Sequence, residues 1–284
     1  MSEIEFSESL YLAMHTDVRL AVAQGWLESG YAHYQKFGRA EGRQLRRFNA
    51  AAHSIRDYTA LVKRLIAEHP GELDLAMAKA VGAHNLDIFQ ATGDKHVYVL
   101  QSLGLKPQQQ IYDLACGCGR TASALRRHGW SGSYCGADII PDLLQFASQK
   151  NPGFQFIYHP DYSIYAEDES LDIVFSWSLF THLYLEEIYL YAQDSYRALK
   201  PGGLFVFSFL SLDDKQHREI FMSRVETLNR GENCVHLDTF LDQTTILSLM
   251  TQMLGFKLQA IYAADDDSVT PSGRFGQALA VFRK

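Results

Sequence analysis

The sequence predicts an α/β fold: a doubly wound, mostly parallel sheet that ends in an antiparallel hairpin, with a helical appendage at the N-terminus. From residue 109 onward, short apolar runs alternate with helical stretches, a pattern typical of parallel strands covered by helices on both faces. The last two runs, 256–263 and 275–283, are joined by a polar loop without a helix. This arrangement indicates an antiparallel pair that closes one edge of the sheet.

The part of the chain before the sheet reads as helices. Its first apolar residues recur at four-residue spacing, at Leu10, Met14, Val18 and Val22. The run "IRDYTALVKRLIAEH" continues with an apolar face until "HPG" ends it. We therefore expect three parts: a small helical module at 1–48, a helical linker or cap at 49–103, and the α/β domain at 104–284.

Five parallel strands are expected in the α/β domain. They lie in the apolar runs that begin at "QQIYDLAC" and continue at 133–138, 154–159, 171–177 and 202–210. A helical run near 243–254 separates the last of these from the terminal hairpin.

Composition excludes several classes of protein. Hydrophobic residues make up 47% of the 284 residues, and 33 acids against 26 bases give a net charge of −7, as in an ordinary globular protein. A nucleic-acid partner is not expected, because basic patches interleaved with aromatic residues are missing from the sequence. The first residues carry acids where a signal peptide carries bases, and no apolar run approaches the about 18 residues of a membrane span. We expect a cytoplasmic protein.

Neither the cysteines nor the acidic runs predict a metal site. Four cysteines are too few for a disulfide framework in a chain of this length. Cys116 and Cys118 are too close together for the usual redox or zinc spacing, and no second pair follows them. The acidic runs at 213–214 and 265–267 read as exposed loop acids. Small residues within a tight turn are the better interpretation of the two cysteines.

The stretch "DLACGCGRTASAL", 113–125, predicts a loop that holds a nucleotide. Gly117 and Gly119 permit positive φ and close approach of a ligand, and the helix that follows supplies unpaired amides. "GCGRTA" satisfies the dinucleotide fingerprint, and Asp138 follows Gly119 by about 20 positions, where an acid meets ribose hydroxyls. This spacing fits a dinucleotide and any other adenosyl cofactor equally well.

Several motifs in order resemble the class I S-adenosylmethionine-dependent methyltransferases over most of 94–284. They are "IYDLACGCGR", "GADI", "HPDYSIYAEDESLDIVFSWSLFTHL" and "RALKPGGLFVFSFL". The resemblance implies a Rossmann-like fold, methyltransferase activity and S-adenosyl-L-methionine as cofactor. An NAD(P)-dependent oxidoreductase that uses "GCGRTA" remains an alternative, although a dehydrogenase should lack the "LKPGG" turn and the terminal hairpin. A non-catalytic binding protein that retains the fold is a second alternative.

The resemblance also implies a set of cofactor-binding residues. The methionine tail and the ribose are bordered by Asp113, Ala115, Cys116, Gly117, Gly119, Asp138 and Ser176, with Asp138 on the ribose hydroxyls and the Ser176 backbone on the ammonium group. The adenine is met by Ile139, Asp161 and Tyr162. The chain departs from the family at two places: Ala115 replaces the usual glycine, and "HPD" replaces the commoner "GD" before Asp161.

Candidate residues for the acceptor side follow the fourth and fifth strands. His182 in "SLFTHLYL" has the intrinsic pKa of a general base for a hydroxyl acceptor, or it caps or packs the following helix. His236 lines the acceptor pocket or is simply solvated. The run "SGRFGQ" resembles the ending of one methyltransferase subgroup, and this resemblance implies that Arg274 and Gln277 lie near the acceptor.

The N-terminal stretch resembles a small helical repeat of bacterial surface and polysaccharide-related proteins. The match is carried by Tyr11, Leu12, Asp17, Val18, Ala21, Gly25, His33, Tyr34, Gly38, Glu41, Gly42 and Arg43. We expect a bacterial module that packs or mediates self-association or a protein contact. Together with the resemblance of "SLFTHL" to a methyltransferase subgroup, this module favours O-methylation of a small-molecule or glycan hydroxyl.

Overall fold

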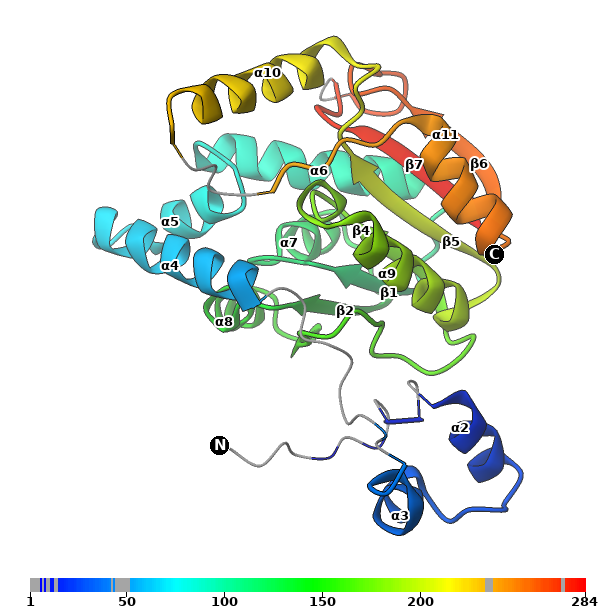
Figure 1. The fold of residues 1–284 in the computed structure, drawn as a ribbon. Helices are drawn as coiled ribbons and strands as arrows, with labels where there is room; N and C mark the ends of the chain where they lie inside the picture. The colour runs from blue at the N-terminus through cyan, green and yellow to red at the C-terminus, as the bar shows by residue number, and fades with distance from the viewer. Residues whose placement is uncertain are drawn as a thin grey trace.

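The centre of the molecule is a seven-stranded sheet with the strand order β3-β2-β1-β4-β5-β7-β6 (Figure 1). The structure is a computed structural model, and it describes residues 6, 8, 11–12, 15–41, 43, 52–232, 237–271 and 274–284. The strands are β1 (Gln110–Leu114), β2 (Ser133–Asp138), β3 (Gln155–Tyr158), β4 (Leu171–Ser176), β5 (Leu199–Phe209), β6 (Lys257–Tyr262) and β7 (Ala278–Arg283).

The predicted mostly parallel sheet with an antiparallel C-terminal hairpin is confirmed. Strands β1 to β5 pair in parallel, whereas β7 is antiparallel to both β5 and β6. The second strand of the hairpin, not the first, therefore pairs with β5. Because β1, β2, β3 and β4 run in parallel, their carboxyl ends meet at one edge of the sheet, where ligands bind in open α/β folds.

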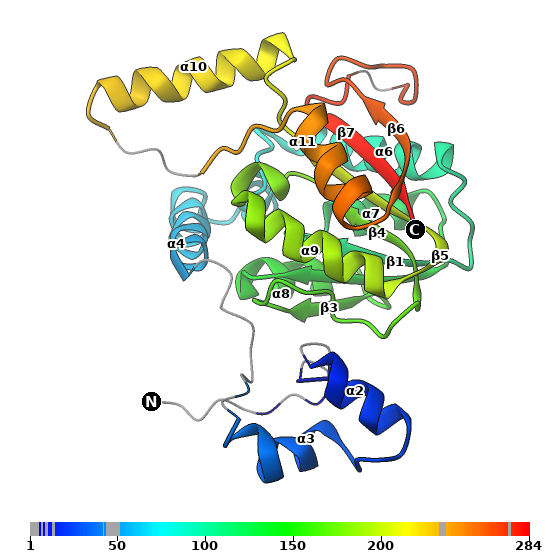
Figure 2. The ribbon, with the colours of Figure 1, turned by 45° about the vertical axis from the view of Figure 1, so that its right-hand side comes forward.

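Helices cover both faces of the sheet. Figures 1 and 2 show α9 (Leu185–Ala198) and α11 (Gln243–Leu247) on one face, with α6 (Leu86–Ser102), α7 (Arg120–Arg127) and α8 (Pro141–Lys150) on the other. A 3-10 turn, η2 (Phe180–His182), leads into α9, and η3 (Ser248–Met253) continues α11. Each face buries its own apolar cluster, as expected where strands are apolar on both sides.

Two further helices, which we call the cap helices, lie over α8 and the loop after β1. They are α4 (Ala52–Glu68) and α5 (Leu73–Ala80). Their apolar sides form one buried cluster in which Val62 and Met77 of the cap helices join Cys118 of the loop and Leu143 and Phe146 of α8. The cap helices are thus packed against the edge of the sheet at which β1 and β2 end.

The described N-terminal residues form a compact group around Tyr11. This group contains α2 (Thr16–Ala23), α3 (Gly30–His33) and η1 (Tyr34–Gly38). The fully buried Tyr11 shares a hydrogen bond of 3.0 Å with Nδ1 of His33, and Arg43 donates two hydrogen bonds to Asp17. Several residues of the predicted repeat pattern therefore make internal contacts.

One helix stands away from the sheet in both views. It is α10 (Lys215–Asn229), which follows β5 in a part of the chain where the sequence pattern is weak (Figures 1 and 2). Asp214, which the sequence indicated as an exposed loop acid, is its N-cap and accepts a hydrogen bond from the amide of His217. Over the part of the chain described here, no helix combines the length and the apolar character needed to cross a membrane.

Candidate active site

The loop after β1 has the backbone geometry of a ligand cradle. Ala115, Gly117 and Gly119 have φ values of +62°, +56° and +81°, in the left-handed region that favours glycine. A Cβ on Gly117 would lie 2.8 Å from Cγ1 of Val81, and one on Gly119 would lie 2.9 Å from Cβ of Ala147. Both glycines are therefore required by close packing as well as by φ.

The acid on β2 is hydrogen-bonded to this loop. Oδ2 of Asp138 accepts from the amide of Gly117 at 2.8 Å, and Oδ1 accepts from the amide of Ile140 at 3.0 Å. Burial raises the pKa of Asp138 above its ordinary value, whereas the backbone amides oppose that shift. The carboxylate is thus fixed in position at the shared edge of β1 and β2.

Asp113 lies deeper, inside a polar network. Tyr134 donates a hydrogen bond of 2.5 Å to Oδ2 of Asp113, and Thr121 is bonded to the same carboxyl. Thr121 is in turn 2.9 Å from Nδ1 of His96, whose ring lies 4.4 Å from that of Trp177. Burial raises the pKa of Asp113 to about 7, although these hydrogen bonds lower it.

The two cysteines of the loop are buried thiols. Burial raises the pKa of Cys116 well above its ordinary value and that of Cys118 to about 12, so both are protonated at neutral pH. Cys116 limits the space beside β2, since a Cβ on Gly136 would come within 2.7 Å of its sulfur. Neither thiol has the thiolate character of a nucleophile or a metal ligand.

The residues assigned to the adenine and to the end of β4 are mostly enclosed. Asp161 is 1% exposed, and the hydroxyl of Tyr162 donates to Glu187 at the start of α9 while its ring packs on Tyr191. Ser176 donates from Oγ to the carbonyl of Leu114 at 3.0 Å, which joins the ends of β4 and β1. Ile139 is half-buried and packs on the cluster beneath the cap helices.

His182 lies in η2, beyond the carboxyl end of β4. Its Nδ1 is 2.8 Å from the carbonyl oxygen of Leu237 and 4.0 Å from a carboxylate oxygen of Asp238. The ring of Tyr58, from α4, lies 6.0 Å from the imidazole in an edge-on arrangement. Burial lowers the pKa of His182, so the imidazole is neutral at physiological pH.

The three residues that the sequence assigns to the acceptor side lie in different surroundings. Gln277 accepts from Ser208 at 2.7 Å and donates to Ser178 at 2.8 Å, which places it at the ends of β4 and β5. Arg274 is exposed, and its carbonyl accepts a hydrogen bond from Lys95 of α6. His236 lies outside the residues that the structure describes.

Sequence reasoning missed Tyr58, Arg120 and Asp238 as members of this region. The pKa of Tyr58 is raised chiefly by burial and then by the charges of Asp238 and Asp138. Arg120 directly follows Gly119, and this position was its only sequence signal. Tyr58 and Asp238 reach the site from the cap helices and from the segment after α10, through contacts that no local pattern reveals.

The residues present fit S-adenosylmethionine. Within the described part of the chain, Nε of Arg120 and Nε2 of His96 are buried polar atoms that no protein group satisfies. A guanidinium donor and an imidazole nitrogen near the glycine loop suit the carboxylate and ammonium of a zwitterionic tail, and Asp138 suits ribose hydroxyls. Within those same described ranges, no three His, Cys, Asp or Glu side chains are arranged to hold a metal ion.

Two surface hollows lie elsewhere. One of about 620 Å³ is lined by residues at the starts of α5 and α6, and one of about 330 Å³ adjoins it between α6, α7 and α8. Two of their basic side chains are paired with acids: Lys150 donates a hydrogen bond to Asp74, and Arg127 donates one to Asp94. Neither hollow includes the carboxyl ends of the strands, and we do not assign either to the site.

Comparisons with known proteins agree with this geometry. Residues 112–207 match the methyltransferase domain family. Among solved structures, a chain in the Haloferax volcanii complex of the Trm112 methyltransferase activator and a methyltransferase is 17% identical, with 80% of this chain and 96% of that chain covered and a TM-score of 0.56. An S-adenosylmethionine-dependent methyltransferase of Thermotoga maritima is 14% identical, with 78% and 99% covered and a TM-score of 0.52.

A third structure, an S-adenosylmethionine-dependent methyltransferase of Methanosarcina mazei, is 18% identical, with 65% and 96% covered and a TM-score of 0.50. At these identities the structures show that the chain shares their fold, and the family match is confined to residues 112–207. The chain therefore has the class I methyltransferase fold, its residues 112–207 match a methyltransferase domain, and the match implies S-adenosylmethionine as the cofactor.

Proposed function

We propose that the chain methylates a hydroxyl of a small molecule or glycan and that His182 is the general base. One observation carries this proposal: the neutral imidazole lies beyond β4 with Nδ1 held at 2.8 Å from the carbonyl of Leu237. Because Nδ1 donates to that carbonyl, Nε2 is the nitrogen that can accept a proton.

The cofactor would be held by residues from the ends of β1, β2, β3 and β4. When bound, S-adenosylmethionine supplies an electrophilic methyl group on a sulfonium. Each oxygen of Asp138 keeps a lone pair for a ribose hydroxyl beyond its bond to a backbone amide. Nε of Arg120, a buried donor, would bind the tail carboxylate. The remaining proposed contacts are Asp113, Ala115, Cys116, Gly117, Gly119 and Ser176 at the tail and ribose, and Ile139, Asp161 and Tyr162 at the adenine.

The protein contributes alignment and proton removal to the transfer. His182 would take the hydroxyl proton at Nε2 while the bound cofactor would supply the methyl group to the acceptor oxygen and keep the sulfur as a thioether. The products are a methyl ether and S-adenosylhomocysteine, and the imidazolium releases its proton to solvent. Gln277, Arg274 and His236 are proposed to line the acceptor side.

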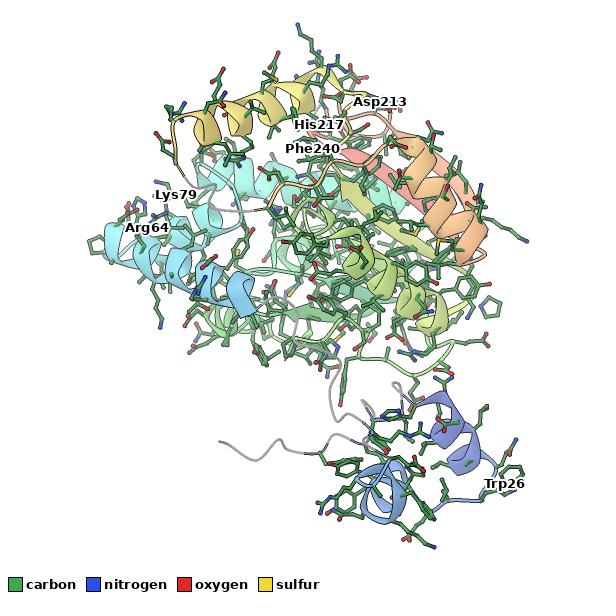
Figure 3. All side chains as sticks on the ribbon, viewed as in Figure 1. Trp26, Arg64, Lys79, Asp213, His217 and Phe240 are labelled. Carbon is green, nitrogen blue, oxygen red and sulfur yellow. The ribbon has the colours of Figure 1, made fainter. Side chains whose placement is uncertain are left out.

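We also propose the division 1–48, 49–103 and 104–284, with an association role for the first part in a cytoplasmic protein. This role is supported by two exposed apolar side chains, Trp26 at 78% and Leu20 at 52% (Figure 3 labels Trp26). The partner is a second copy or another protein.

A transfer assay with labelled methyl donor tests the proposal against hydroxylated sugars, lipids and small phenols. His182→Gln should reduce transfer at least about 100-fold and leave the affinity for S-adenosylhomocysteine unchanged. His128→Gln is the matched control, because His128 pairs with Asp94 at the far end of α7. Binding of NAD(P) instead of S-adenosylmethionine would favour an oxidoreductase, and cofactor binding without transfer to any acceptor would favour a non-catalytic protein.

A further inference from the structure

The inference concerns a segment that we call the strap, residues 237–241, which connects α10 to α11. The strap lies against η2 although more than 50 positions separate the two in sequence. The amide of Thr239 donates to the carbonyl of Thr181 at 2.7 Å, and its hydroxyl donates to the carbonyl of Leu183 at 2.6 Å. These two bonds flank His182 on both sides.

The strap is also fixed to the sheet and to α10. The amide of Leu241 donates to the carbonyl of Leu210 at 2.8 Å, directly after β5. Phe240 packs its ring edge-on against Phe221 of α10 at 5.5 Å, and Figure 3 shows Phe240 beneath that helix. The strap is therefore a fixed support for η2 and not a loosely attached loop.

Asp238 is the charged residue of the strap that faces His182. One of its carboxylate oxygens lies 4.0 Å from Nδ1 of His182, and its side chain is only 8% exposed. Its other oxygen accepts a charge-assisted hydrogen bond from Nε of Arg224 on α10. The titratable or charged groups near the imidazole include Asp238, Arg224 and Tyr58 of α4.

We propose that Asp238 is a positioning residue for His182, and that Arg224 of α10 sets the strength of its effect. The proposal rests on the proposed role of His182 as general base. When His182 accepts the hydroxyl proton, its ring becomes a cation with Nδ1–H directed at Leu237 and Asp238. The nearby carboxylate stabilises that cation, and the guanidinium on the other side of Asp238 reduces the stabilisation.

The two charges act on His182 in opposite directions. Asp238 raises the pKa of His182, whereas Arg224 lowers it. Replacing Asp238 removes an attractive charge near the imidazolium. Replacing Arg224 removes a repulsive charge and leaves Asp238 without its counter-ion. If Asp238 and Arg224 only supported the fold, replacing them would not shift the pKa of His182 in opposite directions.

The test measures the pKa of His182 by NMR titration of the full chain labelled at its histidines, with the His182 signal assigned from His182→Gln. Asp238→Asn should lower this pKa by about one unit, and Arg224→Gln should raise it by a similar amount. Arg230→Gln is the matched control, because this exposed arginine at the end of α10 pairs with Glu232. The proposal is overturned if the first two variants leave the pKa unchanged or shift it in the same direction.

Kinetics separate this proposal from the proposed function. Asp238→Asn should lower kcat about 10-fold and shift its pH profile, with KM for S-adenosylmethionine unchanged and partial rescue in Asp238→Glu. If the NMR shifts occur but His182→Gln retains full transfer, the base assignment fails while the coupling between Asp238 and His182 stands. If His182→Gln is inactive but neither charge variant moves the pKa, the positioning role fails and the base assignment stands.

Discussion

The amide of Gly117 donates a hydrogen bond of 2.8 Å to a carboxylate oxygen of Asp138, so the loop after β1 and the acid that ends β2 form one unit. The other oxygen of Asp138 bonds to the amide of Ile140 at the start of α8. The site is thus built on backbone amides whose orientation is set before any ligand arrives.

Replacing Asp138 should affect both stability and binding. In Asp138→Asn an amide group faces the backbone N–H donors, and a buried donor loses its partner. We expect the free energy of unfolding to fall by about 1 to 3 kcal/mol and the affinity for S-adenosylhomocysteine to fall at least about 10-fold. Urea unfolding and calorimetry measure the two effects. Asp142→Asn, in the first turn of α8, is the control, and equal losses in both variants would contradict the assignment.

Glycine substitutions separate backbone strain from close packing. Gly119 and Gly82 both have a φ of +81°, but a Cβ on Gly119 would meet Ala147 at 2.9 Å and one on Gly82 would meet nothing within 4 Å. Gly82→Ala should lower the free energy of unfolding by about 1 kcal/mol through φ alone. Gly119→Ala should cost at least about 1 kcal/mol more and also weaken cofactor binding. Equal unfolding free energies for the two variants would show that the packing is not tight.

The buried carboxyl of Asp113 should make stability depend on pH. Its pKa rises from 3.8 to about 7 on folding. Between these values the folded state holds a proton that the unfolded state has lost, so stability falls as pH rises, by up to about 1.4 kcal/mol per pH unit.

Asp113→Asn keeps an acceptor for the Tyr134 hydroxyl and removes this titration. The difference in unfolding free energy between the original chain and the variant should therefore decline from about pH 4 to pH 7 and then level off. Urea unfolding at several pH values measures it. A difference that stays constant over this range would show that Asp113 is ionised throughout.

Tyr58 should matter for transfer although it lies outside the matched domain. Its ring packs edge-on against His182, and the charges of Asp238 and Asp138 raise the pKa of its phenol. Tyr58→Ala should lower kcat/KM for an accepted substrate at least about 10-fold, and Tyr58→Phe shows how much of the loss is due to the hydroxyl. Arg64→Ala is the control on the same helix, because the Arg64 side chain is 63% exposed. Full activity in Tyr58→Ala would remove this residue from the site.

The N-terminal group should unfold separately from the cofactor site. A Cβ on Gly38 would lie 2.3 Å from the hydroxyl of Tyr11, whereas one on Gly25 would meet nothing within 4 Å. Gly38→Ala should lower amide-exchange protection in α2 and α3 at least about 10-fold, and more than Gly25→Ala does. The affinity for S-adenosylhomocysteine should not change, and a loss of affinity would show that this group supports the cofactor site.

The sheet was predictable because its strands are apolar on both faces. Strand β2 coincides with the predicted 133–138, whereas β5 begins at Leu199, before the predicted start at residue 202. The reason is a register shift: Leu199 pairs with Leu171 and Leu204 pairs with Ile173, so the "KPGG" turn bulges within the strand. A turn motif predicts the bend but not that pairing resumes on both sides of it.

The acceptor side was less predictable because distant segments build it. Sequence order placed His182 beyond β4, but its contact with Leu237 depends on how the chain returns after α10. In the sequence, Tyr58 is only one aromatic residue of an amphipathic helix. Its place beside the site follows from the packing of the cap helices on α8. Such contacts come from tertiary structure and leave no periodic signal in the sequence.

The contact between Val81 and the glycine loop has a consequence for turnover. Val81 follows α5 and packs so closely over Gly117 that no side chain fits between them. The cap helices and Val81 therefore border the loop on which the spent cofactor would be held. We expect motion of α4 and α5 to govern the exchange of spent for fresh cofactor and to set the steady-state rate.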